Sequence, residues 1–129
     1  MQRKLNIIIY LSEQLNPDHH QGHLGLWSHD VKTNQPRELI KEVSPIFNRA
    51  IIFDTTQDSW HGMSQKLMVP DGIYRKSLAI YYLTEPNNAK LNQRAVYAPR
   101  EDQKNDKQVI ETIKLRSDVN QSSSVYKKK

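Results

Sequence analysis

Three short apolar runs, each bounded by turn-forming residues, most constrain the fold of this chain. The runs LNIIIYL, RAIIFD and SLAIYYL are rich in β-branched and aromatic residues, as buried strands are: Leu5–Leu11, Arg49–Asp54 and Ser77–Leu83. Shorter extended segments are expected at His23–Trp27 and Glu42–Pro45. No segment between the runs is long and periodic enough to form the helical crossovers of a parallel α/β sheet. The pattern therefore predicts an all-β sandwich or barrel.

The chain divides into two parts of different character. Residues 1–84 hold nearly all the apolar runs, whereas residues 85–129 are mostly polar. In the second part, the stretch KQVIETIKL places its valine and isoleucines at helical intervals, which predicts a short helix near residues 107–116. The end of the chain, rich in serine and lysine, is expected to form a flexible tail. We therefore expect one β domain with a polar C-terminal extension.

Composition excludes several classes of protein. The chain of 129 residues has no cysteine, so it has neither a disulfide framework nor a thiolate metal site. No apolar stretch approaches the roughly 20 residues of a membrane-spanning helix. The net charge of +5 comes from dispersed lysines and arginines rather than a basic stripe with interleaved aromatics, so a nucleic-acid partner is not expected. No secretory signal is recognised, and we expect a cytoplasmic protein without a membrane partner.

A histidine and an arginine flank the last two apolar runs. His61 follows the run that ends at Asp54, and Arg75 stands at the start of the run Ser77–Leu83. No His-x-Asp or His-x-Glu pair occurs, and no nucleotide-binding glycine motif is present. The remaining histidines lie in a polar loop or at the ends of a predicted strand, and they are not expected to form a metal site: His19, His20, His23 and His29.

The order of motifs along residues 3–84 resembles the C-terminal part of the Fe(II)/2-oxoglutarate-dependent oxygenases of the prolyl-4-hydroxylase-like branch. LNIIIYLSE is followed by QGHLGLW, then by VSPIFNRAIIFDTTQDSWHGM and YRKSLAIYYLT. The family has, in the same order, a strand ending Tyr-Leu-Asn, a Gly-Gly-x-Leu-x-Leu strand, a Pro-x-Phe-x-Arg segment with a following histidine, and an arginine that begins the last strand. This chain differs at Ser12, where the family usually has asparagine, and at Gln21. The resemblance implies a partial double-stranded β-helix, which is a jelly roll similar to that of cupins.

The resemblance also implies roles for individual residues. His61 matches the family's distal iron ligand, and Arg75 matches the arginine that pairs with the distal carboxylate of 2-oxoglutarate. Ser77 and Tyr10 match residues whose hydroxyls reach the same carboxylate. Trp60 is either a packing residue or a wall of the substrate pocket. Two neighbouring antiparallel strands are expected to bring the histidine and the arginine into one barrel mouth.

The activity implied is hydroxylation of a C–H bond in a protein or small-molecule substrate that the sequence does not identify. Fe(II) is the implied cofactor, 2-oxoglutarate and dioxygen are the cosubstrates, and ascorbate is a reductant. In this reaction 2-oxoglutarate loses carbon dioxide and becomes succinate.

The family's other two iron ligands, a His-x-Asp pair, precede the strand that carries Tyr10. The preceding residues, MQRKLNIII, contain neither histidine nor aspartate. The chain is therefore expected to be the downstream half of an oxygenase, inactive alone and dependent on an N-terminal partner segment that carries His-x-Asp. The alternative is a catalytically inactive β-sandwich that acts as a binding or interaction module. The unpaired strand edges of such a half-domain predict self-association.

Overall fold

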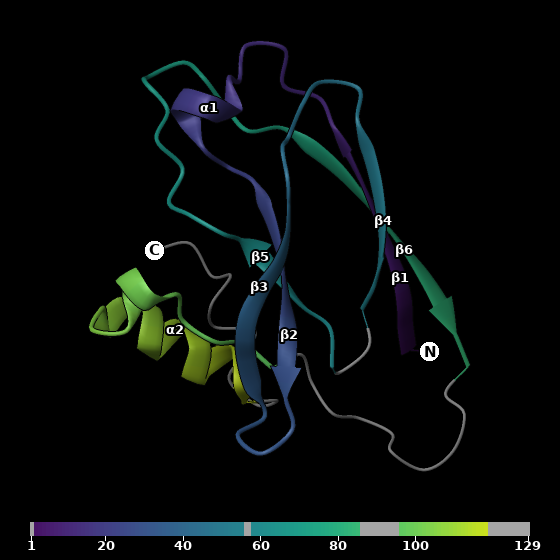
Figure 1. Cartoon of the computed structure of the whole chain (residues 1–129), viewed down its shortest axis with the longest axis vertical. Helices are drawn as coiled ribbons and strands as arrows, with labels where there is room; N and C mark the ends of the chain where they lie inside the picture. Colours follow the sequence, from purple (N-terminus) through teal and green to yellow (C-terminus); the bar gives the residue numbers. More distant parts are fainter. Residues whose placement is uncertain (1, 56–57, 86–95, 119–129) are drawn as a thin grey trace. The chain divides into compact units, whose positions relative to one another are not determined.

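The structure is a computed structural model that describes residues 2–55, 58–85 and 96–118. The chain forms two compact units, Met1–Asn87 and Asn88–Lys129. In chain order (Figure 1) the elements are β1 (Gln2–Tyr10), α1 (Pro17–His20), β2 (Leu24–Asp30), β3 (Gln35–Val43), β4 (Ala50–Asp54), β5 (Trp60–Met63), β6 (Ser77–Thr84), η1 (Glu101–Gln103) and α2 (Lys107–Ser117).

The three apolar runs form one antiparallel sheet with the strand order β4-β1-β6. β1 is the central strand, and its Ile8 pairs with Ile51 of β4 and Ala79 of β6. Because side chains alternate along a strand, Asn6, Ile8 and Tyr10 share one face of the sheet. Asn6 and Tyr10 are buried on this face, which is therefore the inner one.

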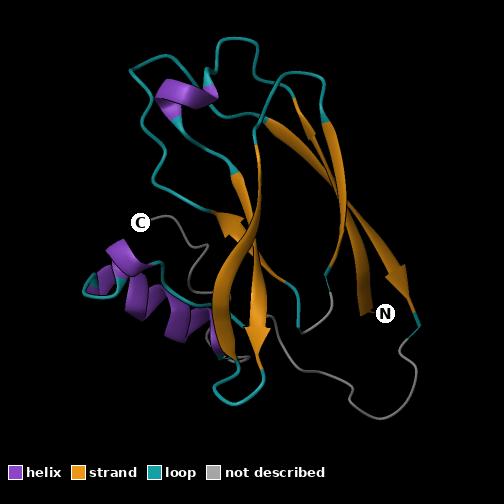
Figure 2. Cartoon of the chain, viewed as in Figure 1, coloured by secondary structure: helices purple, strands orange, loops and turns teal. Residues whose placement is uncertain are grey.

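The second antiparallel sheet has the order β3-β2-β5. Leu26 of the central strand β2 lies opposite Lys41 of β3 and His61 of β5. β3 is an edge strand, a position that tolerates the proline at Pro36. Figure 2 shows the two sheets as separate layers. The buried apolar side chains come from both sheets and from the loop before α1: Tyr10, Leu15, Leu24, Phe53 and Trp60.

The first unit is thus mostly β, with two antiparallel three-stranded sheets and one short helix, as expected of a β-sandwich. This confirms the prediction of a predominantly β fold.

The two strands that sequence reasoning missed are both edge strands. β3 is much longer than the extended segment expected at Glu42–Pro45, and β5 falls in a segment expected to be a loop. α1 is a single turn that Asn16 caps by accepting a hydrogen bond from the amide of Asp18 at 3.0 Å.

The second unit contains η1 and α2, and α2 confirms the short helix predicted near residues 107–116. The side chain of Asp106 caps its N-terminus by accepting hydrogen bonds from the amides of Gln108 and Val109. The guanidinium of Arg116 lies 5.4 Å from the centroid of the Tyr97 ring. The predicted flexible tail falls in residues 119–129, which lie outside the described residues.

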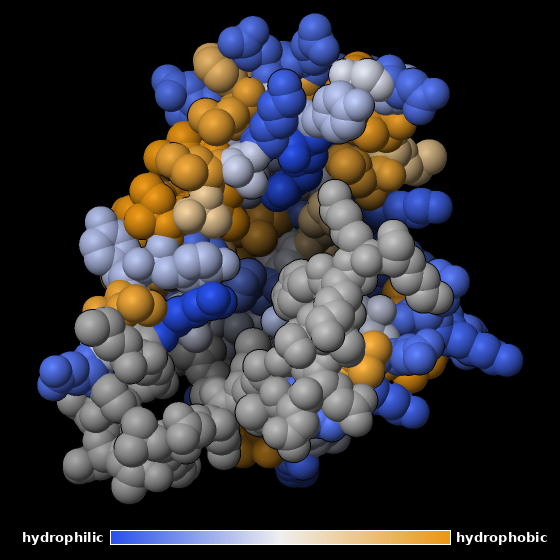
Figure 3. All heavy atoms as spheres, turned by 180° about the vertical axis from the view of Figure 1, so that it is seen from behind, coloured by the Kyte–Doolittle hydropathy of each residue, from blue (hydrophilic) through white to orange (hydrophobic). Residues whose placement is uncertain are grey.

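The outer face of the β4-β1-β6 sheet is also apolar. Its register aligns Ile52, Ile7 and Ile80 across the three strands, and Leu78 and Tyr82 lie on the same side. Ile52 remains 62% exposed and Tyr82 53% exposed. Figure 3, a view from behind, shows hydrophobic surface gathered in its upper left, on the side of β6. A sheet that is apolar on both faces is typical of one that is covered on both faces.

Among the described residues, no helix has the length and apolar character needed to cross a membrane.

Candidate functional site

Tyr10 and Arg75 contact each other on the inner side of the β4-β1-β6 sheet. Tyr10 ends β1 with an exposed fraction of 0%, and the guanidinium carbon of Arg75 lies 5.2 Å from the centroid of its ring. Among the described residues, no group forms a well-aligned hydrogen bond with the buried Tyr10 hydroxyl. Burial raises the pKa of Tyr10 above its ordinary value, although the positive charges of Arg75 and Arg49 partly offset this shift. The Tyr10 phenol is therefore protonated at neutral pH, and its hydroxyl interacts with the Arg75 guanidinium.

Arg75 lies on the approach to β6 and connects the two sheets. Its Nε–H donates a hydrogen bond of 2.8 Å to the carbonyl of Gly22, which precedes β2. This contact fixes the side chain, and the guanidinium also interacts with the Tyr10 hydroxyl, whose pKa it lowers. Ser77 pairs directly with Tyr10 across β1 and β6, so both side chains stand on the inner face. Arg75, which precedes β6, meets this pair through its contact with the Tyr10 ring. The structure thus brings together three of the predicted residues.

His61 belongs to β5, a strand of the opposite sheet, and its side chain is exposed to solvent. Its ring centroid lies 4.7 Å from that of Phe53, a buried residue of β4. The backbone of Ser59 accepts a hydrogen bond from the imidazole, which raises the pKa of His61, but desolvation is the larger effect and lowers it overall. One ring nitrogen is thereby committed to the backbone. This is the arrangement that proteins commonly use to orient a metal-binding histidine.

His61 and Arg75 do not lie on neighbouring strands, so this expectation was wrong. β5 belongs to one sheet and β6 to the other, and the two residues approach the inner space from opposite layers. Phe53, which contacts His61, pairs with Asn6 of β1. Asn6 and Tyr10 are four residues apart, or roughly 13 Å along the strand. The histidine and the arginine are thus offset along the length of the sandwich.

Trp60 stands apart from the other predicted site residues. It neighbours His61 in β5, so its side chain points to the opposite face of the sheet. There its Nε1–H donates a hydrogen bond of 2.9 Å to Nδ1 of His29. Nε2 of His29 lies 3.7 Å from a carboxylate oxygen of Asp58. Trp60 therefore belongs to a Trp–His–Asp chain on the face that points away from Arg75 and Tyr10.

The described residues contain no group of three histidine, aspartate, glutamate or cysteine side chains that could hold a metal ion. The histidines of the polar loop do not change this. His20 instead caps local structure, because its Nδ1 accepts a hydrogen bond of 3.0 Å from the amide of Asn16. Among these residues, the histidine whose ring contacts the inner face of the β4-β1-β6 sheet is His61, which lies against Phe53. The described residues fit the carboxylate end of a small dicarboxylic acid better than they fit a complete iron site.

Sequence reasoning missed Asn6, whose side-chain oxygen is buried without a partner among the described residues. Asn6 pairs with Phe53 on one side and Tyr81 on the other, so it faces the space beside His61. The signal was present in the sequence, because one polar residue interrupts the apolar run LNIIIYL. The Gly22 carbonyl had no such signal, since a backbone acceptor leaves no mark in a sequence.

Most of the first unit matches a known protein family. The model of the 2OG-Fe(II) oxygenase superfamily matches residues 1–83, which include β1 to β6 up to the penultimate residue of the last strand. Comparison with the curated proteins finds no match. The superfamily implies a general dependence on Fe(II) and 2-oxoglutarate and supports a general oxygenase function. Since the match spans more than half of the sequence, the chain belongs to the 2OG-Fe(II) oxygenase superfamily.

Proposed function

We propose that this chain forms the 2-oxoglutarate-binding side of a dioxygenase of the prolyl-4-hydroxylase-like branch, with residues 1–84 as part of a jelly-roll domain and residues 85–129 as an extension. The observation that carries the proposal is the cluster of Arg75, Tyr10 and Ser77 on the inner face of the family-matched segment. A guanidinium and two hydroxyls are the donors that a carboxylate requires. The distal carboxylate of 2-oxoglutarate is the ligand that we assign to them.

The contacts of Arg75 specify how the carboxylate would be bound. Because Nε already donates to the Gly22 carbonyl, the two Nη groups would pair with the carboxylate oxygens. Tyr10 would donate its hydroxyl to the same carboxylate, and its raised pKa keeps that proton in place at neutral pH. The bound ligand would thereby accept the proton of a buried hydroxyl for which the described residues provide no acceptor.

His61 would supply one iron ligand, and its lowered pKa favours the neutral, metal-binding form of the ring at neutral pH. The other two ligands are not provided by the described residues, so we propose that a partner segment carrying His-x-Asp completes the site. When bound, Fe(II) with dioxygen and 2-oxoglutarate supplies the oxidising power for C–H hydroxylation, with ascorbate as reductant. No step of that reaction is assigned to a residue of this chain.

The test is a comparison of two keto acids. The 129-residue chain is titrated with 2-oxoglutarate and with 2-oxobutyrate, which lacks the distal carboxylate, while the side-chain Nε–H signal of Arg75 is followed by NMR. We expect 2-oxoglutarate to shift this signal saturably and 2-oxobutyrate to leave it in place. Equal responses to both acids, or no response to either, would overturn the proposed site.

A second candidate function is a non-catalytic binding module. The observation that favours it is the single inward imidazole in place of a three-ligand group among the described residues. The two candidates differ once a His-x-Asp segment is supplied by fusion or co-expression. Iron-dependent release of succinate by the completed protein supports the dioxygenase, whereas 2-oxoglutarate binding without succinate release supports the binding module.

A further inference from the structure

Ser12 lies two residues beyond Tyr10 and forms an unusual set of backbone contacts. It is polar but only 5% exposed. Its hydroxyl accepts a hydrogen bond of 2.5 Å from the amide of Lys76 and donates one of 2.8 Å to the carbonyl of Tyr74. The carbonyl of Lys76 lies farther away, at 3.4 Å. We therefore assign the single hydroxyl proton to the hydrogen bond with the Tyr74 carbonyl.

These two contacts bracket Arg75. The Tyr74 carbonyl belongs to the peptide group that precedes the Cα atom of Arg75, and the Lys76 amide belongs to the one that follows it. One hydroxyl therefore holds the backbone on both sides of the arginine. The regular ladder between β1 and β6 reaches only Tyr10 and Ser77, with one more bond of 3.0 Å from the amide of Leu11 to the carbonyl of Lys76. Ser12 continues the pairing beyond the point where the strands end.

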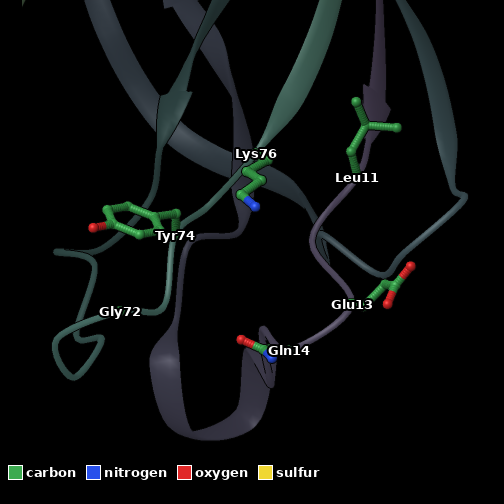
Figure 4. Close-up of a pocket in the computed structure, with 6 residues that line it drawn as sticks. All are labelled: Leu11, Glu13, Gln14, Gly72, Tyr74 and Lys76. Carbon is green, nitrogen blue, oxygen red and sulfur yellow. The ribbon is translucent and has the colours of Figure 1, made fainter.

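A surface pocket lies between the segments that Ser12 joins, beyond the single backbone bond from Leu11 to Lys76. Figure 4 shows its lining, which comes from the segment after β1 and the segment before β6: Leu11, Glu13, Gln14, Gly72, Tyr74 and Lys76. Segments that flank an open pocket have few packing contacts to fix their spacing. The Ser12 hydroxyl therefore adds to the Leu11–Lys76 bond in holding the backbone of Arg75 against the end of β1.

We propose that Ser12 is a positioning residue for Arg75 and, through Arg75, for 2-oxoglutarate. The inference rests on the proposed function only for the identity of the ligand. Ser12 fixes the Cα atom of Arg75, and the Gly22 carbonyl fixes its Nε, so both ends of the side chain are held. A flexible arginine would have to lose this freedom on binding, and pre-organisation removes that cost.

The test compares Ser12→Ala with Ser28→Ala. Ser28 is a matched control, since its hydroxyl also joins two strands, accepting a 3.0 Å hydrogen bond from the amide of Glu38. Two quantities are measured by NMR on the full chain: the hydrogen-exchange rate of the Arg75 Nε–H and the dissociation constant for 2-oxoglutarate. Ser12→Ala should speed the exchange and weaken binding roughly three- to tenfold. Ser28→Ala should do neither, and Ser12→Thr, which keeps the hydroxyl, should restore both.

The exchange rate of the Arg75 Nε–H tests the positioning role of Ser12, and the dissociation constant of the wild-type chain tests the proposed function. If the wild-type chain does not bind 2-oxoglutarate at Arg75, the proposed function fails, and the tether is still judged by the exchange rate. If Ser12→Ala leaves the exchange of Arg75 Nε–H unchanged, or affects binding no more than Ser28→Ala, the positioning role is wrong. If Ser12→Ala does not fold, the wild-type chain decides the question, because a Lys76 amide less protected from exchange than the Leu11 amide contradicts the tether.

Discussion

At the scale of single residues, Tyr10 shows how a binding site can oppose stability. Its ring is completely buried, yet its hydroxyl has no well-aligned partner among the described residues. A buried donor that is left unsatisfied costs about 1–3 kcal/mol. Such a group is explained most simply by a ligand that pairs with it, and the neighbouring Arg75 indicates that this ligand is an anion.

We therefore predict that Tyr10→Phe separates stability from binding. The variant keeps the ring and removes the buried hydroxyl, so the free energy of unfolding should stay level or rise by roughly 1 kcal/mol. The dissociation constant for 2-oxoglutarate should increase about three- to tenfold, the effect of one neutral hydrogen bond. Chemical denaturation and NMR titration measure the two quantities. Tyr82→Phe on the exposed outer face is the control and should change neither. A large loss of stability in Tyr10→Phe would show that the hydroxyl has a structural partner.

The same variant should change the alkaline limb of the stability curve. The folded state raises the pKa of Tyr10 above its ordinary value of 10.0, so the unfolded chain loses this proton first as pH rises. The stability that the neutral phenol contributes is therefore complete below pH 10 and is lost above it. Tyr10→Phe should flatten that loss in denaturation curves taken at increasing pH.

At the scale of elements, the sequence was most informative where strands are apolar. β1, β4 and β6 were predicted to within a few residues, because a run of apolar and β-branched residues indicates a strand whatever packs against it. β3 was missed because it is exposed along most of its length and so lacks an apolar alternation. β5 was missed because four residues, WHGM, are too few to show a period.

The candidate site residues could be chosen from the resemblance, but their mutual placement could not. Arg75, Tyr10 and Ser77 come together through the pairing of β1 with β6, and two apolar strands already suggest that pairing. His61 faces them from the other sheet, and its position depends on long-range pairing between β2 and β5. The pairing of β2 with β5 leaves no such signal in the local sequence, so the neighbouring-strand arrangement was a natural but wrong inference.

The Trp–His–Asp chain on the outer face of β5 gives a prediction at the element scale. Trp60→Phe removes the hydrogen bond from Nε1 to His29 and some buried volume, and it should lower the free energy of unfolding by roughly 1–3 kcal/mol. It should leave 2-oxoglutarate binding unchanged, since Trp60 faces away from Arg75. Adding His29→Ala should cost less in this variant than in the wild type, and a double-mutant cycle measures the difference. Strong loss of ligand binding in Trp60→Phe would place the indole in the pocket instead.

At the scale of the whole chain, the apolar outer face of the β4-β1-β6 sheet predicts self-association. Exposed apolar faces and unpaired edges of this kind favour contact with a second copy. Ile80→Lys places a charge in the middle of the face and should lower the weight-average mass in sedimentation. Val31→Lys is the control, because Val31 is 85% exposed in the turn between β2 and β3. A wild-type chain that sediments as a monomer at micromolar concentration and above would contradict this prediction.

The central claim is that Arg75 binds the distal carboxylate of 2-oxoglutarate, and the most direct measurement is its dissociation constant for three variants. Hydrogen bonds to charged groups contribute roughly 1.5–3 kcal/mol, so Arg75→Ala should weaken binding by about one to two orders of magnitude. Arg75→Lys should recover only part of this loss, because a point ammonium does not reproduce the planar fork. Lys76→Ala should bind like the wild type, since Lys76 alternates to the other side of the chain. The account is contradicted if Lys76→Ala weakens 2-oxoglutarate binding and Arg75→Ala does not.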